Sequence, residues 1–278
     1  MTKHRSGILW GAGFLSLGAA ILSLYAQAPY AVGTHYARGQ DVSPTFEGWE
    51  GNPDGTFTLY FGYYNRNSEE EIDVPIGPLN HFDGDADQGQ PTHFYTGRRW
   101  FVFKKVVPKT WTQNDRLTWT LTSHGRTNVS KGWLQPEWEI DKALITKNSP
   151  SDPFLRITNS TPNPNNKPPE VTASSAPSIT LPAKATLTAN ATDDGLPKPG
   201  APGRGGRPQG LQIRWITYRG PAKVVVEPET SPVVYGQPLS FAATASFSEP
   251  GAYRLRAIAT DGSLFSTYDV DIDVKPGK

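Results

Sequence analysis

The amino-acid sequence predicts an all-β fold with two β-sandwich domains behind an N-terminal signal or anchor helix. Three observations support this prediction. The chain of 278 residues is rich in turn formers and aromatic residues, with 26 prolines, 27 glycines, 8 tryptophans, 11 tyrosines and 12 phenylalanines. Short alternating apolar runs recur without a helical period. A proline- and asparagine-rich segment then separates two stretches, each long enough to bury its own core.

The first 28 residues predict export. Residues 3–5 are basic, residues 8–26 are uncharged and mostly apolar, and small residues suitable for cleavage stand at Ala26 and Ala28. Two outcomes are open: cleavage as a signal peptide, or retention of residues 8–26 as a membrane anchor. Either predicts a periplasmic or extracellular protein that contacts a membrane only through an uncleaved helix. With 0 cysteines the chain has no disulfide or lipoprotein site, and it is typical of bacterial exported proteins.

The domain boundaries follow the composition. We expect a first β-sandwich of unknown function over residues 36–157 and a second domain over residues 170–275. Residues 158–169, Thr-Asn-Ser-Thr-Pro-Asn-Pro-Asn-Asn-Lys-Pro-Pro, have almost nothing apolar to bury and predict an extended linker.

The first domain reads as a series of strands separated by turns. The sequence predicts strands over residues 56–64, 70–76, 98–107, 116–122 and 127–134, with a last edge strand over 154–157. In the fourth of these, Leu117, Trp119 and Leu121 alternate with threonines, so we expect Trp119 in the core.

The second domain carries more specific motifs. Pro250-Gly251 precedes Tyr253-Arg254-Leu255, and Ala259-Thr260-Asp261-Gly262 follows. This order resembles the strand F signature of PKD-like and related immunoglobulin-like repeats in exported bacterial proteins. The resemblance implies an immunoglobulin-like sandwich that spaces, displays or binds. The first domain resembles only uncharacterised exported bacterial proteins that carry Gly-Gln-Pro-Thr-His-Phe, here residues 89–94, and this second resemblance implies no activity.

An acidic loop in the first domain is a candidate metal site. Asp83, Asp85 and Asp87 alternate among glycines, and such carboxylates suit Ca²⁺. The pattern departs from an EF-hand loop, because the glycine is one position late and the twelfth residue is Phe94 instead of Glu. The alternatives are therefore a Ca²⁺ site and a solvated acidic loop. Otherwise no cofactor is expected.

Other polar groups give weaker hypotheses. His81 and His93 flank the acidic loop and suggest either a transition-metal site or hydrogen-bonded loop histidines. Acidic residues of the second domain could converge where the chain enters it, or could cap their own turns. These are Glu170, Asp193, Asp194 and Asp261.

The long loop over residues 195–210 allows two interpretations. One is a flexible surface excursion. The other is a cationic contact loop for an acidic surface, formed by Lys198, Arg204 and Arg207.

Tryptophans give the remaining candidate site. Trp49, Trp111 and Trp138 have small, polar or charged neighbours, so we expect them to be exposed and able to stack on sugar rings. The alternative is that these aromatic side chains pack in the core or at sheet edges.

The motifs exclude several functions. The formal charge of +1 argues against a nucleic-acid partner. Nucleophile elbows, phosphate loops and dinucleotide fingerprints are missing from the sequence, so we do not expect an enzyme.

The sequence predicts an exported, non-catalytic binding or display protein whose partner is a protein or polysaccharide of the cell envelope. A carbohydrate-binding protein is the main alternative. A hydrolase with an unrecognised site is the other, with Glu137 and Glu139 as its only carboxylate pair of interest.

Overall fold

Strands make up nearly all of the regular structure in the computed structural model, which describes residues 35–140, 165–198 and 210–277. Several predictions lie outside these residues: the signal or anchor helix, the edge strand over 154–157, and the loop arginines at 204 and 207. Residues from Tyr36 onward belong to one compact unit. In the described part of the chain, no helix is long and apolar enough to cross a membrane.

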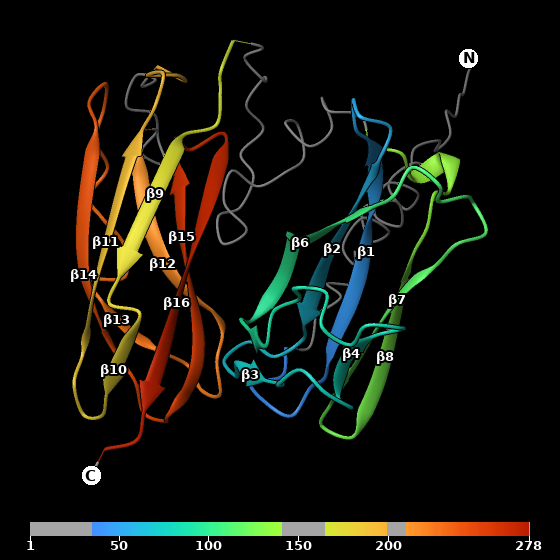
Figure 1. The fold of residues 1–278 in the computed structure, drawn as a ribbon, viewed down its shortest axis with the longest axis horizontal. Helices are drawn as coiled ribbons and strands as arrows, with labels where there is room; N and C mark the ends of the chain where they lie inside the picture. Colours follow the sequence, from blue (N-terminus) through green and yellow to red (C-terminus); the bar gives the residue numbers. More distant parts are fainter. Residues whose placement is uncertain (1–34, 141–164, 199–209, 278) are drawn as a thin grey trace, which may run out of the picture. The chain divides into compact units, whose positions relative to one another are not determined.

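The first sandwich packs two three-stranded sheets, and a short two-stranded ribbon stands beside them (Figure 1). The first sheet contains β1 (Val42–Gly51), β2 (Phe57–Asn65) and β6 (Gly97–Val107). The second sheet contains β4 (Asn80–Phe82), β7 (Leu117–Ser123) and β8 (Arg126–Gly132). The ribbon pairs β3 (Ile72–Asp73) with β5 (His93–Phe94), so the strand expected over residues 70–76 is reduced to two residues.

Aromatic rings fill the core of the first sandwich. Trp119 is fully buried, as its alternating pattern predicts, and it stacks on Phe82 with ring centroids 5.6 Å apart. Its indole N–H donates to Asn80 Oδ1 at 2.9 Å, which satisfies the one polar atom that burial would otherwise leave unpaired. Phe61 and Phe103 complete this group of rings.

The second sandwich has immunoglobulin-like topology. One sheet has the order β13 (Val225–Glu227), β14 (Leu239–Ser246), β11 (Ala185–Thr192), β9 (Glu170–Ser175). The other has the order β10 (Ser178–Thr180), β16 (Phe265–Lys275), β15 (Gly251–Thr260), β12 (Gln212–Arg219). Only β10 and β16 pair in parallel among these strands. This is the arrangement of an immunoglobulin-like fold, and β9 begins at Glu170, where we expected the second domain to start.

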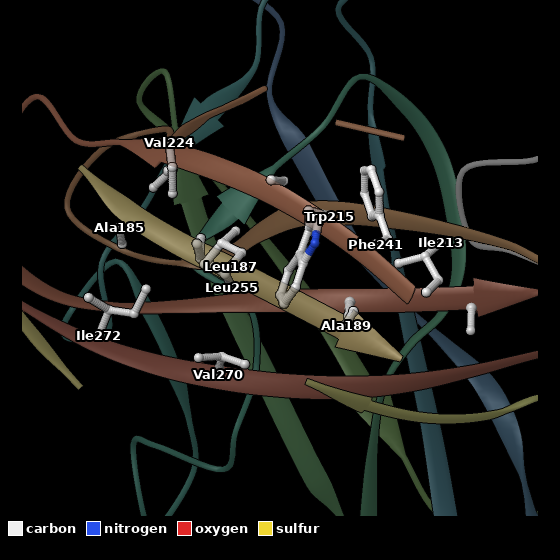
Figure 2. Packing of buried hydrophobic residues seen from close by; sticks show 14 of the residues in the cluster. Ala185, Leu187, Ala189, Ile213, Trp215, Val224, Phe241, Leu255, Val270 and Ile272 are labelled. Carbon is white, nitrogen blue, oxygen red and sulfur yellow. The ribbon is translucent and has the colours of Figure 1, made fainter. Parts of the chain in front are cut away.

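The core of the second sandwich lies between these two sheets (Figure 2). Alternation explains it, because Leu187 and Ala189 point inward from β11 while Thr186, Thr188 and Asn190 lie on the other face. Trp215 from β12 and Leu255 from β15 meet them from the opposite sheet. Burial of each large side chain stabilises the fold by roughly 2 kcal/mol.

A buried tyrosine closes one corner of this sandwich. Tyr253 lies near the start of β15, and its hydroxyl donates to the backbone oxygen of Glu249, four residues upstream, at 2.8 Å. A tyrosine at this place and with this bond is a recurrent feature of immunoglobulin-like folds. The structure therefore confirms the all-β fold class and the immunoglobulin-like class of the second domain.

Candidate functional site at the junction of the sandwiches

Residues of the first sandwich bind directly to the end of β12 in the second. We call residues 87–95 the junction segment. It contains the Gly-Gln-Pro-Thr-His-Phe stretch and is joined to residues 217–223 by eight hydrogen bonds. Because a motif singled out in the sequence occupies this interface, we treat the junction as the candidate site.

Thr92 and Tyr218 form the centre of the junction, where both are buried. The backbone N–H of Thr92 donates to the Tyr218 oxygen at 3.1 Å, and the Gly220 N–H donates to the Thr92 hydroxyl at 3.0 Å. The Tyr218 hydroxyl donates to the Gly89 oxygen at 2.7 Å. These bonds satisfy polar groups that would otherwise be buried without partners. If the two stretches separated, these groups would either become exposed to water or stay buried without a hydrogen-bond partner.

Arg219 forms a clamp at the outer edge. Its Nε donates to the Gln90 oxygen at 2.7 Å, and its two terminal nitrogens bind both carboxylate oxygens of Asp87 at 3.0 and 2.8 Å. The hydrogen bond from Arg219 lowers the pKa of Asp87, and its charge adds to this effect. Arginine fits this role because its planar fork matches a carboxylate.

A histidine between two carboxylates lies at the inner edge. His93 Nδ1 is 2.7 Å from Asp73 Oδ1, and His93 Nε2 is 3.0 Å from Glu71 Oε2. Glu71 Oε2 also pairs with Lys223 of the second sandwich at 2.7 Å. Tyr95 packs edge-on against His93 at 4.5 Å, and its hydroxyl accepts the Thr217 N–H at 2.9 Å.

A cavity of 740 Å³ lies beside these contacts. Aromatic side chains of the first sandwich line it, notably Tyr60, Phe101 and Phe103, and Arg254 and Arg256 line it from the second. Its volume lies within the range of small-molecule sites, and its lining combines apolar area with a few charged groups, as such sites do.

A bulge in β6 places one of these rings. Phe101 has φ of 52°, which is unusual for a residue with a bulky side chain, and it packs edge-on against Tyr60 at 5.6 Å. The pairing of β2 with β6 shifts register beside Gly62. A Cβ at Gly62 would lie 2.2 Å from the Arg99 oxygen, so only glycine allows the two strands to approach this closely.

The second sandwich presents a ladder of charge pairs at the cavity. Arg254 binds Asp271 and Arg256 binds Asp269, each through two hydrogen bonds between facing positions of β15 and β16. Arg256 also donates to the Val102 oxygen of β6 at 3.0 Å and lies over the Tyr218 ring at 3.7 Å. It therefore connects both sandwiches at the cavity wall.

The acidic loop has a partner within the protein. Asp87 binds Arg219, and Asp83 and Asp85 are exposed. Asp85 and Asp87 each also accept a backbone N–H two residues ahead, as aspartates do in turns. Within residues 35–140, 165–198 and 210–277, no three Asp, Glu, His or Cys side chains gather closely enough to hold a metal ion. The Ca²⁺ hypothesis therefore stays a prediction.

The tryptophan prediction was wrong for one residue. Trp49 is 9% exposed, because its ring packs edge-on against Phe57 and its N–H donates to the Gln135 oxygen at 2.7 Å. Trp111 is half-buried against the first core. Trp138 is 42% exposed and stacks on Phe46, next to Trp133. It is the last residue of η1 (Pro136–Trp138), and the neighbouring Glu137 and Glu139 are also exposed.

The other polar residues that the sequence singled out lie either near the junction or near the entrance to the second domain. His93 joins the junction cluster, whereas His81 Nδ1 is buried without a hydrogen-bond partner among the described residues. Burial raises the pKa of Asp261 to about 6, and the charge of nearby Asp193 adds to the rise. Asp194 instead binds the backbone N–H groups of Lys167 and Leu196. Glu170 and Lys198 are exposed.

Sequence reasoning missed the side chains that build the junction from the second sandwich, namely Tyr218, Arg219 and Arg256. One signal was available, because Arg254-x-Arg256 and Asp269-x-Asp271 have the same spacing on neighbouring strands and opposite charge. Nothing comparable marks Phe101, whose position depends on the bulge.

Comparisons with known proteins do not identify a family. No protein-family model matches the chain, and no curated protein matches it. Among solved structures, S-layer protein SbsC domains 4 and 5 align at 12% identity over 85% of this chain and 98% of that one, with a TM-score of 0.25. The titin Z1Z2 domains in complex with telethonin align at 13% identity over 85% and 98%, with a TM-score of 0.24.

An endo-fucoidan hydrolase of glycoside hydrolase family 107 aligns at 13% identity over 87% of this chain and 28% of that one, with a TM-score of 0.24. TM-scores this low carry no argument about this protein. The immunoglobulin-like class of the second sandwich therefore stands on its strand order and its tyrosine corner.

Proposed function

We propose that this protein is an exported, non-catalytic binding protein of the bacterial envelope or surface, and that its ligand occupies the junction cavity. The observation that carries this proposal is the cavity of 740 Å³ whose walls come from both sandwiches. The hydrogen bonds of the junction segment hold those walls together, so the cavity is formed before any ligand arrives. A preformed site avoids the ordering cost of binding.

The lining favours an acidic glycan as the ligand. Tyr60 and Phe101 offer aromatic faces and edges for the apolar side of sugar rings. Lys104 is exposed at the same wall, and Arg254 adds a guanidinium. Such groups form charge-assisted hydrogen bonds with carboxylates or sulfates. Arg254 is already paired with Asp271, so the gain from an acidic glycan rests mainly on Lys104, which has no ion pair among the described residues.

The state of His93 supports a non-catalytic role. A general base needs a nitrogen with a free lone pair near the substrate. Both ring nitrogens of His93 face carboxylate oxygens within the protein, and the side chain is 1% exposed. This histidine therefore serves structure at the junction and offers no proton acceptor to a ligand.

Two finer assignments belong to this proposal. Export rests on the basic start, the apolar run over residues 8–26 and the small residues at the cleavage site. Membership of the PKD-like group rests on the motif order around Tyr253 and Asp261, together with the tyrosine corner.

A calorimetric titration tests the ligand class. We expect the purified protein to bind hexagalacturonate at pH 6 and not maltohexaose, an uncharged oligosaccharide of equal length. Phe101→Ala with Lys104→Glu should weaken binding at least tenfold. The matched control is Trp100→Ala on the same strand, because Trp100 is 38% exposed and outside the cavity lining. Equal binding of both oligosaccharides, or an unaffected double variant, would contradict the proposal.

A second candidate place for a glycan is the surface at Trp138. Its exposed indole stacks on Phe46 with ring centroids 5.4 Å apart and an angle of 11° between the planes. Titration of the Trp138→Ala variant with the same oligosaccharides distinguishes this surface from the junction cavity as the glycan-binding site. Loss of binding there, with the cavity variants unaffected, would move the site to this surface.

A further inference from the structure

We infer that the junction is a proton-dependent lock, in which His93 must carry a proton on both ring nitrogens for the two sandwiches to stay fully bonded. The lock is a property of the junction and does not depend on a ligand. Its effect on ligand binding rests on the proposed function.

The geometry requires the doubly protonated ring. Carboxylate oxygens accept and cannot donate, and one stands at each nitrogen of His93, at 2.7 and 3.0 Å. A neutral imidazole donates through one nitrogen only. Its other nitrogen would then point a lone pair at a carboxylate oxygen, and the ring itself is buried, with its side chain 1% exposed.

Protonated His93 is linked to the second sandwich through a single carboxylate oxygen. Glu71 Oε2 accepts from His93 Nε2 and from Lys223 Nζ, so it joins a first-sandwich cation to a second-sandwich cation. Tyr95 adds a second path, because its ring lies against His93 while its hydroxyl accepts the Thr217 N–H. Loss of the His93 proton therefore disturbs two contacts between the sandwiches.

The charges around His93 come from each element packed against it. Asp73 stands on β3 and Glu71 just before it, Lys223 follows β12, and Tyr95 follows β5. The hydroxyl of Tyr63 on β2 accepts the Tyr95 N–H. Arg99 on β6 interacts electrostatically with Tyr63, and Asp73 interacts electrostatically with Tyr253 on β15. The two carboxylates are the charged groups in direct contact with His93.

These surroundings set the direction of the pH dependence. Burial alone would lower the pKa of His93, but hydrogen bonds to Asp73 and Glu71 outweigh it and raise the pKa above its ordinary 6.5. The lock is therefore complete below pH 6.5 and is lost as the pH rises through the pKa of His93 in the folded protein.

Paired spin labels can measure the lock directly. The chain has 0 cysteines, so Val129→Cys on β8 and Val225→Cys on β13 place one label on each sandwich without competing thiols. Both positions are more than half exposed, at 52% and 54%. Double electron–electron resonance on the ligand-free protein should give a narrow distance distribution at pH 6. The distribution should at least double in width by pH 9, below the ordinary pKa of lysine.

Two variants sharpen the test. His93→Gln has its donors on a single nitrogen, so its side-chain oxygen would face the second carboxylate, and it should give the broad distribution at every pH. His124→Gln is the matched control, because His124 pairs with Glu70 inside the first sandwich, and it should behave like the parent. A parent distribution that stays narrow from pH 6 to pH 9 overturns the lock, whether or not His93→Gln folds. Absence of glycan binding at pH 6 would refute the proposed function alone.

Discussion

At the scale of single residues, Asp261 shows how burial and hydrogen bonding compete. Its side chain is fully buried, yet it accepts the backbone N–H groups of Ser263 and Leu264 and the Asn166 amide. Burial is the larger effect and raises the pKa of Asp261 from 3.8 to about 6. The carboxylate therefore becomes charged at neutral pH at a cost to the folded state.

We predict that Asp261→Asn stabilises the protein at pH 7.5, by on the order of 2 kcal/mol. Because the pKa is raised on folding, the wild type loses stability as the pH rises through about 6, and the amide removes this loss. Asn166 can turn its own amide to accept from the new one, since its oxygen has no partner among the described residues.

Urea unfolding at pH 4.5 and pH 7.5 measures this effect. Asp194→Asn is the control, since Asp194 is an exposed turn residue of the same region. An Asp261→Asn protein less stable than the wild type at pH 7.5 would show that the hydrogen bonds to the charged carboxylate outweigh its burial.

At the scale of elements, the bulge between β2 and β6 determines where Phe101 stands. Arg98 supports this bulge by donating to the Tyr63 and Arg99 oxygens, and it binds both carboxylate oxygens of Glu47 at 2.6 and 2.8 Å. Close approach of β2 to β6 at Gly62 is the condition for this arrangement. The cavity wall is therefore built from strand geometry as much as from side chains.

We predict that Gly62→Ala destabilises the protein by about 2–4 kcal/mol and broadens the signals of Phe101, because the new methyl group collides with the backbone oxygen of Arg99 and with the paired side chains of Glu47 and Arg98. Gly51→Ala is the matched control, since it lies in β1 of the same sheet with open space around its Cβ position. Thermal unfolding and NMR spectra of both variants give the measurement. Equal stability of the two would mean that the strands can separate without loss.

The elements also show how far the sequence could predict the fold. Strict alternation predicted β7 with Trp119 inward, and the Pro-Gly, tyrosine and Asp-Gly order predicted the end of the second sandwich. These are local patterns, and a strand has a period of two wherever it packs. The exposed tryptophan prediction failed at Trp49, because neighbours in sequence do not reveal a ring from another strand. The junction could not be predicted for the same reason, because Thr92 and Tyr218 lie far apart in the sequence and meet only in the folded protein.

At the scale of the whole molecule, the junction couples the two sandwiches. Each has its own core, and the bonds from Thr92, Arg219 and Lys223 connect them. Unfolding of one sandwich breaks these hydrogen bonds, each of which contributes about 0.5–1.5 kcal/mol net. We therefore expect the two sandwiches to unfold together while the junction is intact.

We predict that Arg219→Met splits one calorimetric transition at pH 6 into two, because it removes the clamp on Asp87 and the bond to Gln90. The control is Arg254→Met, which breaks an equally well-formed pair with Asp271 inside the second sandwich. A single transition in Arg219→Met would show that the remaining junction bonds suffice for coupling.

The parallel pairing of β10 with β16 has a mechanical consequence. These strands hold residues 178–180 beside residues 273–275, close to the two ends of the second sandwich in sequence. When the ends of that domain are pulled apart, the paired strands slide along each other, so their hydrogen bonds bear the load at the same moment. An antiparallel pair pulled from one end would open one bond at a time. The second sandwich is thus built to resist tension applied between its two ends.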